Sequence, residues 1–197
     1  MAKTTEEAGR SGWRTMEFDG RTGMMAGAAL AGLALGVAGV IGKKFAMQAA
    51  SSAGKDWDEM LKAEHRAVEA LLDKLEQTDD SSRMARSGLV MHIKKALTKH
   101  ALQEENAVYP AMAEKLDDER AAAMFNDHAD MKKALHALVE CDRADPAFIT
   151  RVRELRRIVL DHIVEEEELL DTLKRHLSAE ENTTLNSQTW REGVALS

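Results

Sequence analysis

Apolar residues recur every three to four positions through most of the chain after residue 55. This period places them along one face of a helix. It holds over four long segments that are separated by short polar stretches: 56–78, 82–115, 118–142 and 145–177. Short connections force neighbouring helices to run antiparallel. The pattern therefore predicts an all-α fold, an antiparallel up-down-up-down four-helix bundle over residues 56–177.

The predicted helix ends rest on capping residues and prolines. Pro110 lies late in the second segment and predicts a kink there. We expect a short C-terminal tail helix within residues 178–197. A serine or aspartate followed three residues later by glutamate indicates a capping box, and proline favours the first helical position. These signals occur at the first helix, the tail helix and the fourth helix: Asp56 with Glu59, Ser178 with Glu181, and Asp145 with Pro146.

The first 55 residues differ in character from the rest of the chain. Residues 1–21 mix charges of both signs without a period, whereas residues 22–42 carry no charge. As a helix, that uncharged segment would cover about 30 Å, the hydrocarbon thickness of a bilayer. We therefore predict a transmembrane helix followed by a linker, residues 43–55. Small residues recur at every fourth position of the helix and predict a homodimer face: Gly23 and Gly27, then Ala28, Gly32 and Gly36.

The predicted span sets the expected location of the protein. We expect an inner-membrane anchor with the bundle in the cytoplasm, and a soluble cytoplasmic protein if residues 22–42 do not span. Cys141 is the single cysteine of the chain, so no intrachain disulfide forms, which fits a reducing compartment.

Composition and charge narrow the class of partner. Only 4% of the residues are aromatic and two are proline, a composition that favours helices over sheets. The formal net charge is -7, and nucleic-acid binding depends largely on Lys and Arg neutralising phosphates. We therefore expect no nucleic-acid partner.

Each of the four apolar stripes is interrupted by a histidine. Two of the stripes also carry a glutamate four residues after that histidine. Counted along their helices, the histidines lie within two turns of the same level. Burying unpaired imidazoles and carboxylates costs several kcal/mol unless they satisfy one another or share a cation. The sequence therefore predicts a buried metal site whose ligands are His65, His100, Glu104, His128, His162 and Glu166.

The predicted ligands repeat from one helical hairpin to the next. His65 and His100 are 35 residues apart, and His128 and His162 are 34 apart. Two metal ions can each take two histidines, with both glutamates and a solvent-derived oxygen bridging them. This leaves an open position for a small molecule. Imidazole with carboxylate suits iron, and manganese and zinc are competitors.

Other readings of single residues remain open. A lone histidine on an apolar helix face is usually a hydrogen-bonded core residue, and His65 has Glu69 at the same spacing as the proposed pairs. We interpret three other members of the glutamate run, Glu165, Glu167 and Glu168, as a solvated face. Three further residues have roles that the sequence does not assign, the two histidines among them being interpreted as peripheral: Glu69, His92 and His136. His176 is expected to complement the helix dipole.

The combined motif resembles the hemerythrin family, specifically its bacterial hemerythrin-like (HHE) cation-binding branch. The resemblance covers about residues 56–177 and includes the stretch EENAVYP after His100. Ferritin-like bundles instead place Glu three residues before His, a spacing absent here. The resemblance implies a non-haem di-iron centre, oxo- and carboxylate-bridged, that handles O2, NO or peroxide.

Two departures from oxygen-carrying hemerythrins shape the expected function. Their fifth histidine ligand is replaced by Lys132, and the C-terminal carboxylate, Glu166, is a glutamate one residue nearer its histidine. Both argue against reversible oxygen carriage. We expect a module that binds or senses a small gas or peroxide in oxidative or nitrosative stress or iron handling, rather than a dedicated enzyme. The alternatives are a di-iron enzyme that activates peroxide or O2 or donates iron for cluster repair, and a metal-free structural bundle.

Overall fold

The computed structural model describes residues 56–195, and this part is all-helical, as predicted. The predicted polar segment, transmembrane helix and linker lie outside the described residues. None of the helices within residues 56–195 is long and apolar enough to cross a membrane. The elements are α2 (Trp57–Glu76), α3 (Arg83–Gln103), the π-helical turn η1 (Glu104–Val108), α4 (Tyr109–Lys115), α5 (Asp118–Glu140), α6 (Phe148–His176) and α7 (Ala179–Ala195).

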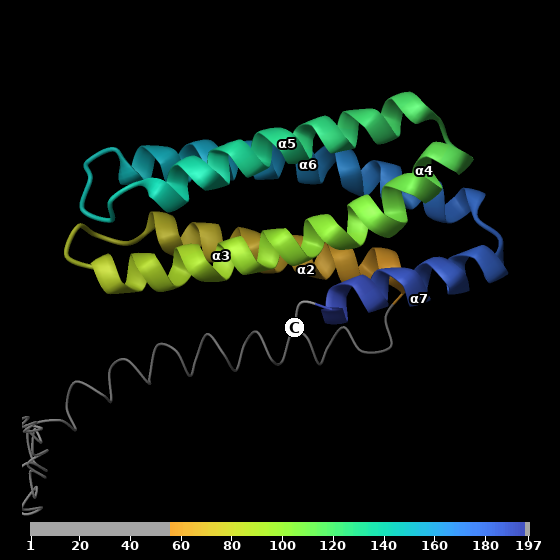
Figure 1. Cartoon of the computed structure of the whole chain (residues 1–197), viewed down its shortest axis with the longest axis horizontal. Helices are drawn as coiled ribbons and strands as arrows, with labels where there is room; N and C mark the ends of the chain where they lie inside the picture. Colours follow the sequence, from red (N-terminus) through yellow and green to blue (C-terminus); the bar gives the residue numbers. More distant parts are fainter. Residues whose placement is uncertain (1–55, 196–197) are drawn as a thin grey trace, which may run out of the picture. The chain divides into compact units, whose positions relative to one another are not determined.

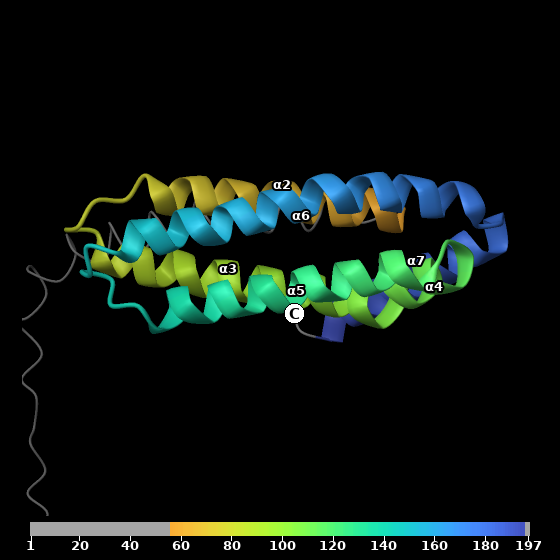
Figure 2. The same cartoon turned by 90° about the horizontal axis from the view of Figure 1, so that it is seen from above.

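Two antiparallel hairpins make up the body of the domain. One consists of α2 and α3, which η1 and α4 continue, and the other consists of α5 and α6 (Figure 1). The α2–α3 and α5–α6 connections lie at the same end of the body. Seen from above, α2 lies beside α6, and α3 lies beside α5 (Figure 2). The order around the bundle is therefore α2, α3, α5, α6 and back to α2.

The apolar stripes form the interior of this bundle. In α2 the stripe residues Leu61, Leu72 and Leu75 are completely buried. Fully burying a leucine side chain stabilises the fold by about 1.5–3 kcal/mol. At the α4 end, side chains from five helices and η1 close one cluster, whose members include Trp57, Val108, Met112, Met124, Leu170 and Leu185. Burial of the stripes thus fixes the rotation of each long helix about its own axis. This rotation determines which polar residues of the helix face the interior.

The tail helix α7 is longer than predicted and packs on the bundle. It has 17 residues. Its predicted capping box is confirmed: the Ser178 backbone N–H donates to Glu181 Oε2 at 2.8 Å, and the Glu181 N–H donates to Ser178 Oγ at 3.3 Å. Further along, Gln103 Nε2 of α3 donates to the carbonyl of Thr189 at 3.3 Å. A Cβ at Gly193 would lie 2.7 Å from that same Nε2, so glycine permits the close approach.

The first helix begins directly after Asp56, as predicted, but its expected capping bond is absent, and the predicted start of the fourth helix is wrong. Asp56 makes no capping hydrogen bond, because its carboxylate accepts from Lys174 instead. The helix α6 begins at Phe148, three residues after the predicted cap at Asp145. There the Asp145 carboxylate accepts from the Ala147 N–H at 2.8 Å and forms a separate turn before the helix. Local side-chain bonding competes with helix capping at such residues.

A buried arginine ties together the two connections at one end of the bundle. Arg86 is 1% exposed. Its Nη1 donates to the carbonyl of Arg143 in the α5–α6 connection at 2.7 Å, and its Nε donates to Thr78 Oγ1 in the α2–α3 connection at 2.9 Å. The guanidinium also lies 4.8 Å from the ring centre of Phe148, a cation–π contact.

Replacing this arginine should destabilise the domain. Arg86→Leu keeps apolar contact with Phe148 but removes the donors, and we expect the free energy of unfolding to fall by about 2–3 kcal/mol. Urea denaturation followed by circular dichroism measures the change. Arg83→Leu is the matched control, because Arg83 is exposed on the same helix. Equal stability of the two variants would show that the hydrogen bonds of Arg86 to the two connections do not stabilise the domain.

Candidate metal centre

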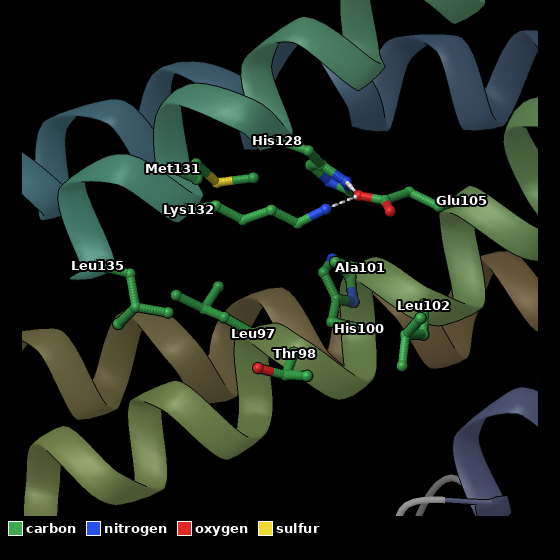
Figure 3. Close-up of a pocket in the computed structure, with 10 residues that line it drawn as sticks. All are labelled: Leu97, Thr98, His100, Ala101, Leu102, Glu105, His128, Met131, Lys132 and Leu135. Atoms are coloured by element: carbon green, nitrogen blue, oxygen red, sulfur yellow. Dashed lines mark hydrogen bonds and ion pairs between the residues drawn. The ribbon is translucent and has the colours of Figure 1, made fainter. Parts of the chain in front are cut away.

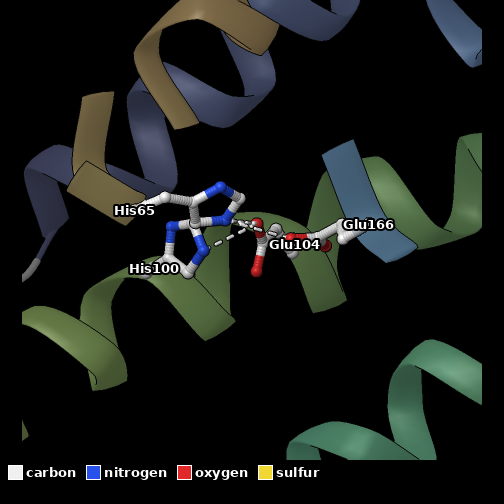
Figure 4. A group of neighbouring side chains, drawn as sticks. All are labelled: His65, His100, Glu104 and Glu166. Atoms are coloured by element: carbon white, nitrogen blue, oxygen red, sulfur yellow. Dashed lines mark hydrogen bonds and ion pairs between the residues drawn. The ribbon is translucent and has the colours of Figure 1, made fainter. Parts of the chain in front are cut away.

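The structure brings the six predicted ligand residues together inside the bundle. They come from four sides, and none is more than 4% exposed: His65 of α2, His100 of α3, Glu104 of η1, His128 of α5, and His162 and Glu166 of α6. They form two overlapping groups in which the candidate ligand atoms of each group lie within 4.8 Å of one another. Figure 4 shows the first group, His65 and His100 with both glutamates. The second contains His128 and His162 with the same two glutamates.

The inner faces of the histidines point at these shared carboxylates. Each glutamate lies between one histidine of each hairpin. The four Nε2 atoms approach carboxylate oxygens at 2.9 Å for His100 and Glu104, 3.3 Å for His128 and Glu104, 3.1 Å for His65 and Glu166, and 3.4 Å for His162 and Glu166. Glu104 and Glu166 are therefore shared by the two groups of candidate ligands, each of which also contains two imidazoles.

A second set of carboxylates holds the outer faces of the histidines. Each Nδ1 lies near a carboxylate of the preceding helix around the bundle, so the contacts form a closed ring in one direction. The distances are 3.2 Å from Glu64 to His100, 2.8 Å from Glu105 to His128, 3.5 Å from Asp127 to His162 and 3.0 Å from Glu167 to His65. A carboxylate on the outer nitrogen fixes the ring orientation and makes a metal-ligating imidazole more basic.

Sequence reasoning missed this outer ring. Glu167 was expected on a solvated face, and that expectation is wrong, because its carboxylate is half-buried and bonds to His65. A signal was present in both hairpins: every outer carboxylate is the chain neighbour of an inner ligand. The pairs are Glu64–His65, Glu104–Glu105, Asp127–His128 and Glu166–Glu167. The other two members of the run, Glu165 and Glu168, are exposed.

The remaining candidate residues lie away from the two groups. His92 and His136 are exposed and belong to neither group. Glu69 is partly exposed and also belongs to neither. His176 is exposed in the last turn of α6, where its Nδ1 lies 2.9 Å from the carbonyl of Thr172.

The π-turn η1 places a tyrosine beside the shared carboxylates. In an α-helix, residues five apart point about 140° away from each other. Here the Tyr109 N–H bonds to the carbonyl of Glu104, five residues back, and this wider turn brings both side chains to the interior. The Tyr109 hydroxyl donates to Glu166 Oε1 at 2.6 Å and lies 2.9 Å from His128 Nε2. The interruption predicted near Pro110 is thus a π-turn that precedes the proline.

The buried glutamates and histidines of the two groups stabilise one another's charged forms. Burial alone would raise the pKa of Glu166, but the imidazoles of His162 and His65 outweigh it and hold that pKa well below its usual value. Burial opposes protonation of His100, yet Glu104 and Glu64 raise its pKa well above the usual value. Opposite charges within a few ångströms favour the charged form of each partner.

Several atoms in the two groups nevertheless lack hydrogen-bond partners. They are buried and make ion-pair contacts, at 2.9 Å for His100 with Glu104 and 3.4 Å for His162 with Glu166, that do not form hydrogen bonds. In the described residues they are His100 Nε2, both oxygens of Glu104 and both ring nitrogens of His162. Imidazole nitrogen and carboxylate oxygen are donors that iron, manganese and zinc accept. A shared cation would satisfy these atoms, so the residues present fit a metal site.

Comparison with known proteins agrees with this chemistry. The family described as "Hemerythrin HHE cation binding domain" matches residues 58–172, more than half of the chain. The chain belongs to the hemerythrin HHE family. The matched residues include all six inner residues and all four outer carboxylates, whereas α7 lies beyond them.

One curated relative comes from Nostoc sp. strain PCC 7120 and is named a DNA nickase. It is 28% identical over 124 residues, which are 62% of this chain and 35% of that protein. The aligned part of the chain thus spans about a third of the relative's length. No solved structure matches the chain at a significant level.

A small pocket between α3 and α5 leads to the candidate metal centre. Its volume is about 150 Å³. Its walls are mainly apolar, and the histidines of both hairpins, His100 and His128, line it (Figure 3). On one wall the Lys132 ammonium donates to Glu105 Oε1 at 2.5 Å, and the same oxygen lies 2.8 Å from His128 Nδ1. The pocket thus offers space for a small molecule beside two of the buried histidines.

The outer ring makes a testable contribution to metal affinity. We expect Glu64→Ala to lower the affinity for a divalent cation about 10- to 100-fold, because His100 loses the carboxylate that orients it. Titration against a chromophoric chelator measures this affinity. Glu69→Ala is the matched control on the same helix, outside both groups. Equal affinities for the two variants would argue against an orienting role.

Proposed function

We propose that the HHE domain holds a di-iron centre that binds a small diatomic or peroxide ligand, O2, NO or H2O2. Its metal ligands are the six inner residues: His65, His100, Glu104, His128, His162 and Glu166. The observation that carries the proposal is the sharing of Glu104 and Glu166 by two groups of candidate ligands. Each group offers two imidazoles and two carboxylates, four donors in all. A six-coordinate metal ion held by these four donors would keep positions for solvent and for an added ligand.

The architecture in this proposal is the up-down-up-down four-helix bundle, closed on one side by α7. Each hairpin supplies one histidine pair and one shared glutamate. Neither hairpin contains a complete group, because every group takes a carboxylate from both. The centre therefore depends on the two hairpins being docked.

The size of the pocket supports a small ligand, of at most about the volume of benzene. A cavity of about 150 Å³ lies between Leu97 and Leu135 and reaches the two inner histidines His100 and His128. Apolar cavities of this order bind species such as xenon or benzene. A diatomic gas or peroxide fits this space, and we infer a binding or sensing module in oxidative or nitrosative stress or iron handling.

One observation favours an enzyme as the second candidate. The Tyr109 hydroxyl lies at the shared carboxylates and donates to Glu166 at 2.6 Å. Burial, together with the charges of Glu104 and Glu166, raises the pKa of Tyr109 well above its usual value, so the hydroxyl keeps its proton. A buried O–H that keeps its proton beside the centre is placed to donate a hydrogen bond to a peroxide or O2 held there.

DNA nicking is not part of the proposal. That activity is named for the Nostoc protein, of which the alignment covers 35%. This chain carries a formal net charge of -7, which repels the phosphate backbone.

Metal counting on the iron-loaded full-length chain tests the centre. We expect about two irons per chain and a visible absorption of bridged ferric iron. Glu104→Ala removes a donor from both groups and should reduce the content far below that of the parent chain. His176→Ala, a change on the exposed face of α6, should leave the content unchanged. Normal iron content in Glu104→Ala would refute the assignment.

The same preparation ranks the ligands. After anaerobic reduction, O2, NO and peroxide are added separately and spectra are recorded. Stable spectral changes that reverse on removal of the gas indicate binding or sensing. Repeated turnover of peroxide or O2 without a stable complex indicates the enzymatic alternative.

We further propose that residues 22–42 anchor the chain in a membrane, with the HHE domain on the cytoplasmic side and two chains paired through the small-residue face. The uncharged length of the segment supports this proposal. The full-length chain should then sediment with membranes and resist an alkaline wash, whereas a chain starting at residue 50 should not. Full-length protein in the soluble fraction would exclude the anchor.

A further inference from the structure

A second cavity lies between α5 and α6 and differs in character from the apolar pocket. It is an open groove with a volume of about 500 Å³. The buried His162 lines it, together with residues of both helices. Five carboxylates face three basic side chains in this lining: Asp127, Asp130, Glu154, Asp161 and Glu165 against Lys133, Arg151 and Arg157.

His162 is the least restrained of the four inner histidines. Its side chain is 2% exposed, and neither ring nitrogen has a hydrogen-bond partner among residues 56–195. The reason is a difference between the two hairpins. Glu64 approaches His100 Nδ1 to 3.2 Å, whereas its counterpart Asp127, one methylene shorter, remains 3.5 Å from His162 Nδ1. An imidazole held only by ion-pair contacts, to Glu166 at 3.4 Å and to Asp127 at 3.5 Å, thus lies where the polar groove meets the candidate metal centre.

Negative charge is available beside this imidazole. Arg157 is paired with Asp161 at 2.8 Å, and Lys133 is paired with Asp130 at 2.8 Å. Glu165 has no ion-pair partner within the described residues and is exposed. A cleft with an excess of one charge raises the local concentration of the opposite ion.

We propose that this groove is the path by which a divalent cation reaches and leaves the metal centre, with His162 as the ligand that meets the ion first. The inference rests on the proposed function of the inner residues as metal ligands. The apolar pocket between α3 and α5 is unsuited to a hydrated cation, because its walls offer little to replace the hydration shell. In the groove, Asp127 and Glu165 supply oxygen ligands next to His162.

The rate of metal uptake tests the path separately from the final metal content. Metal-free full-length chain is mixed with Co²⁺ in a stopped-flow instrument, and the appearance of the bound-cobalt spectrum is followed. We expect Glu165→Gln to take up Co²⁺ about three- to tenfold more slowly, and Arg157→Gln to take it up faster. Both should reach the same final cobalt content as the parent chain, because neither residue belongs to the inner groups.

Two further variants sharpen the test. Glu119→Gln removes the same charge from an exposed site on α5 outside the groove, and its uptake rate should match that of the parent chain. Asp127→Glu supplies the longer carboxylate found at residue 64 and should hold His162 in place. We expect its loaded form to release cobalt to a chelator several times more slowly than the parent chain.

The outcomes distinguish this inference from the proposed function. Unchanged rates in Glu165→Gln and Arg157→Gln, with normal cobalt content, would overturn the path and leave the centre intact. Equal slowing by Glu165→Gln and Glu119→Gln would also overturn it, because only the overall charge would then matter. A parent chain that takes up no cobalt or iron would overturn the centre itself.

Discussion

The fold depends on balancing charges that the bundle removes from water. Glu104 and Glu166 are completely buried, and an unpaired carboxylate in such surroundings costs several kcal/mol, a large share of the stability of a typical domain. The four inner imidazoles and the ring of outer carboxylates offset this cost. They do so only if each helix keeps its rotation about its own axis, because each outer carboxylate belongs to a neighbouring helix. Apolar packing on both sides of the buried polar residues therefore also positions these residues.

The ring also explains why neither hairpin is sufficient. Within each hairpin one contact is internal, such as that of Glu64 with His100. The other two contacts, Glu105 with His128 and Glu167 with His65, cross between hairpins. Docking the hairpins without these pairs would leave imidazoles unoriented and carboxylates unpaired. Since partly satisfied polar networks are unfavourable, docking and completion of the site are one event.

The sequence predicts the features of the site that depend on a single helix and misses those that depend on contacts between helices. Helical periodicity placed the inner residues on buried faces, because it reports burial along each helix separately. The outer carboxylates stand on the flanks of helices, where burial depends on which helix is adjacent, and Glu167 was misjudged for that reason. The π-turn at Glu104 has no periodic signature over five residues. The packing of α7 depends on close approaches such as that of Gln103 to Gly193. The mostly polar sequence of this helix gives no pattern from which such contacts could be predicted.

The two hairpins are similar but unequal. Their differences support the proposal that a small ligand and a metal ion reach the centre by different routes. Only the first hairpin contains a π-turn, and it brings Tyr109 to the shared carboxylates. Only the second has the shorter Asp127, which leaves His162 Nδ1 without a hydrogen bond beside a polar groove. The apolar pocket opens on another side of the bundle, between α3 and α5. A neutral gas prefers apolar walls and a hydrated cation requires oxygen ligands. Under the two proposals, gas and cation would therefore approach the centre from different sides, so a ligand in the pocket would not obstruct exchange of metal through the groove.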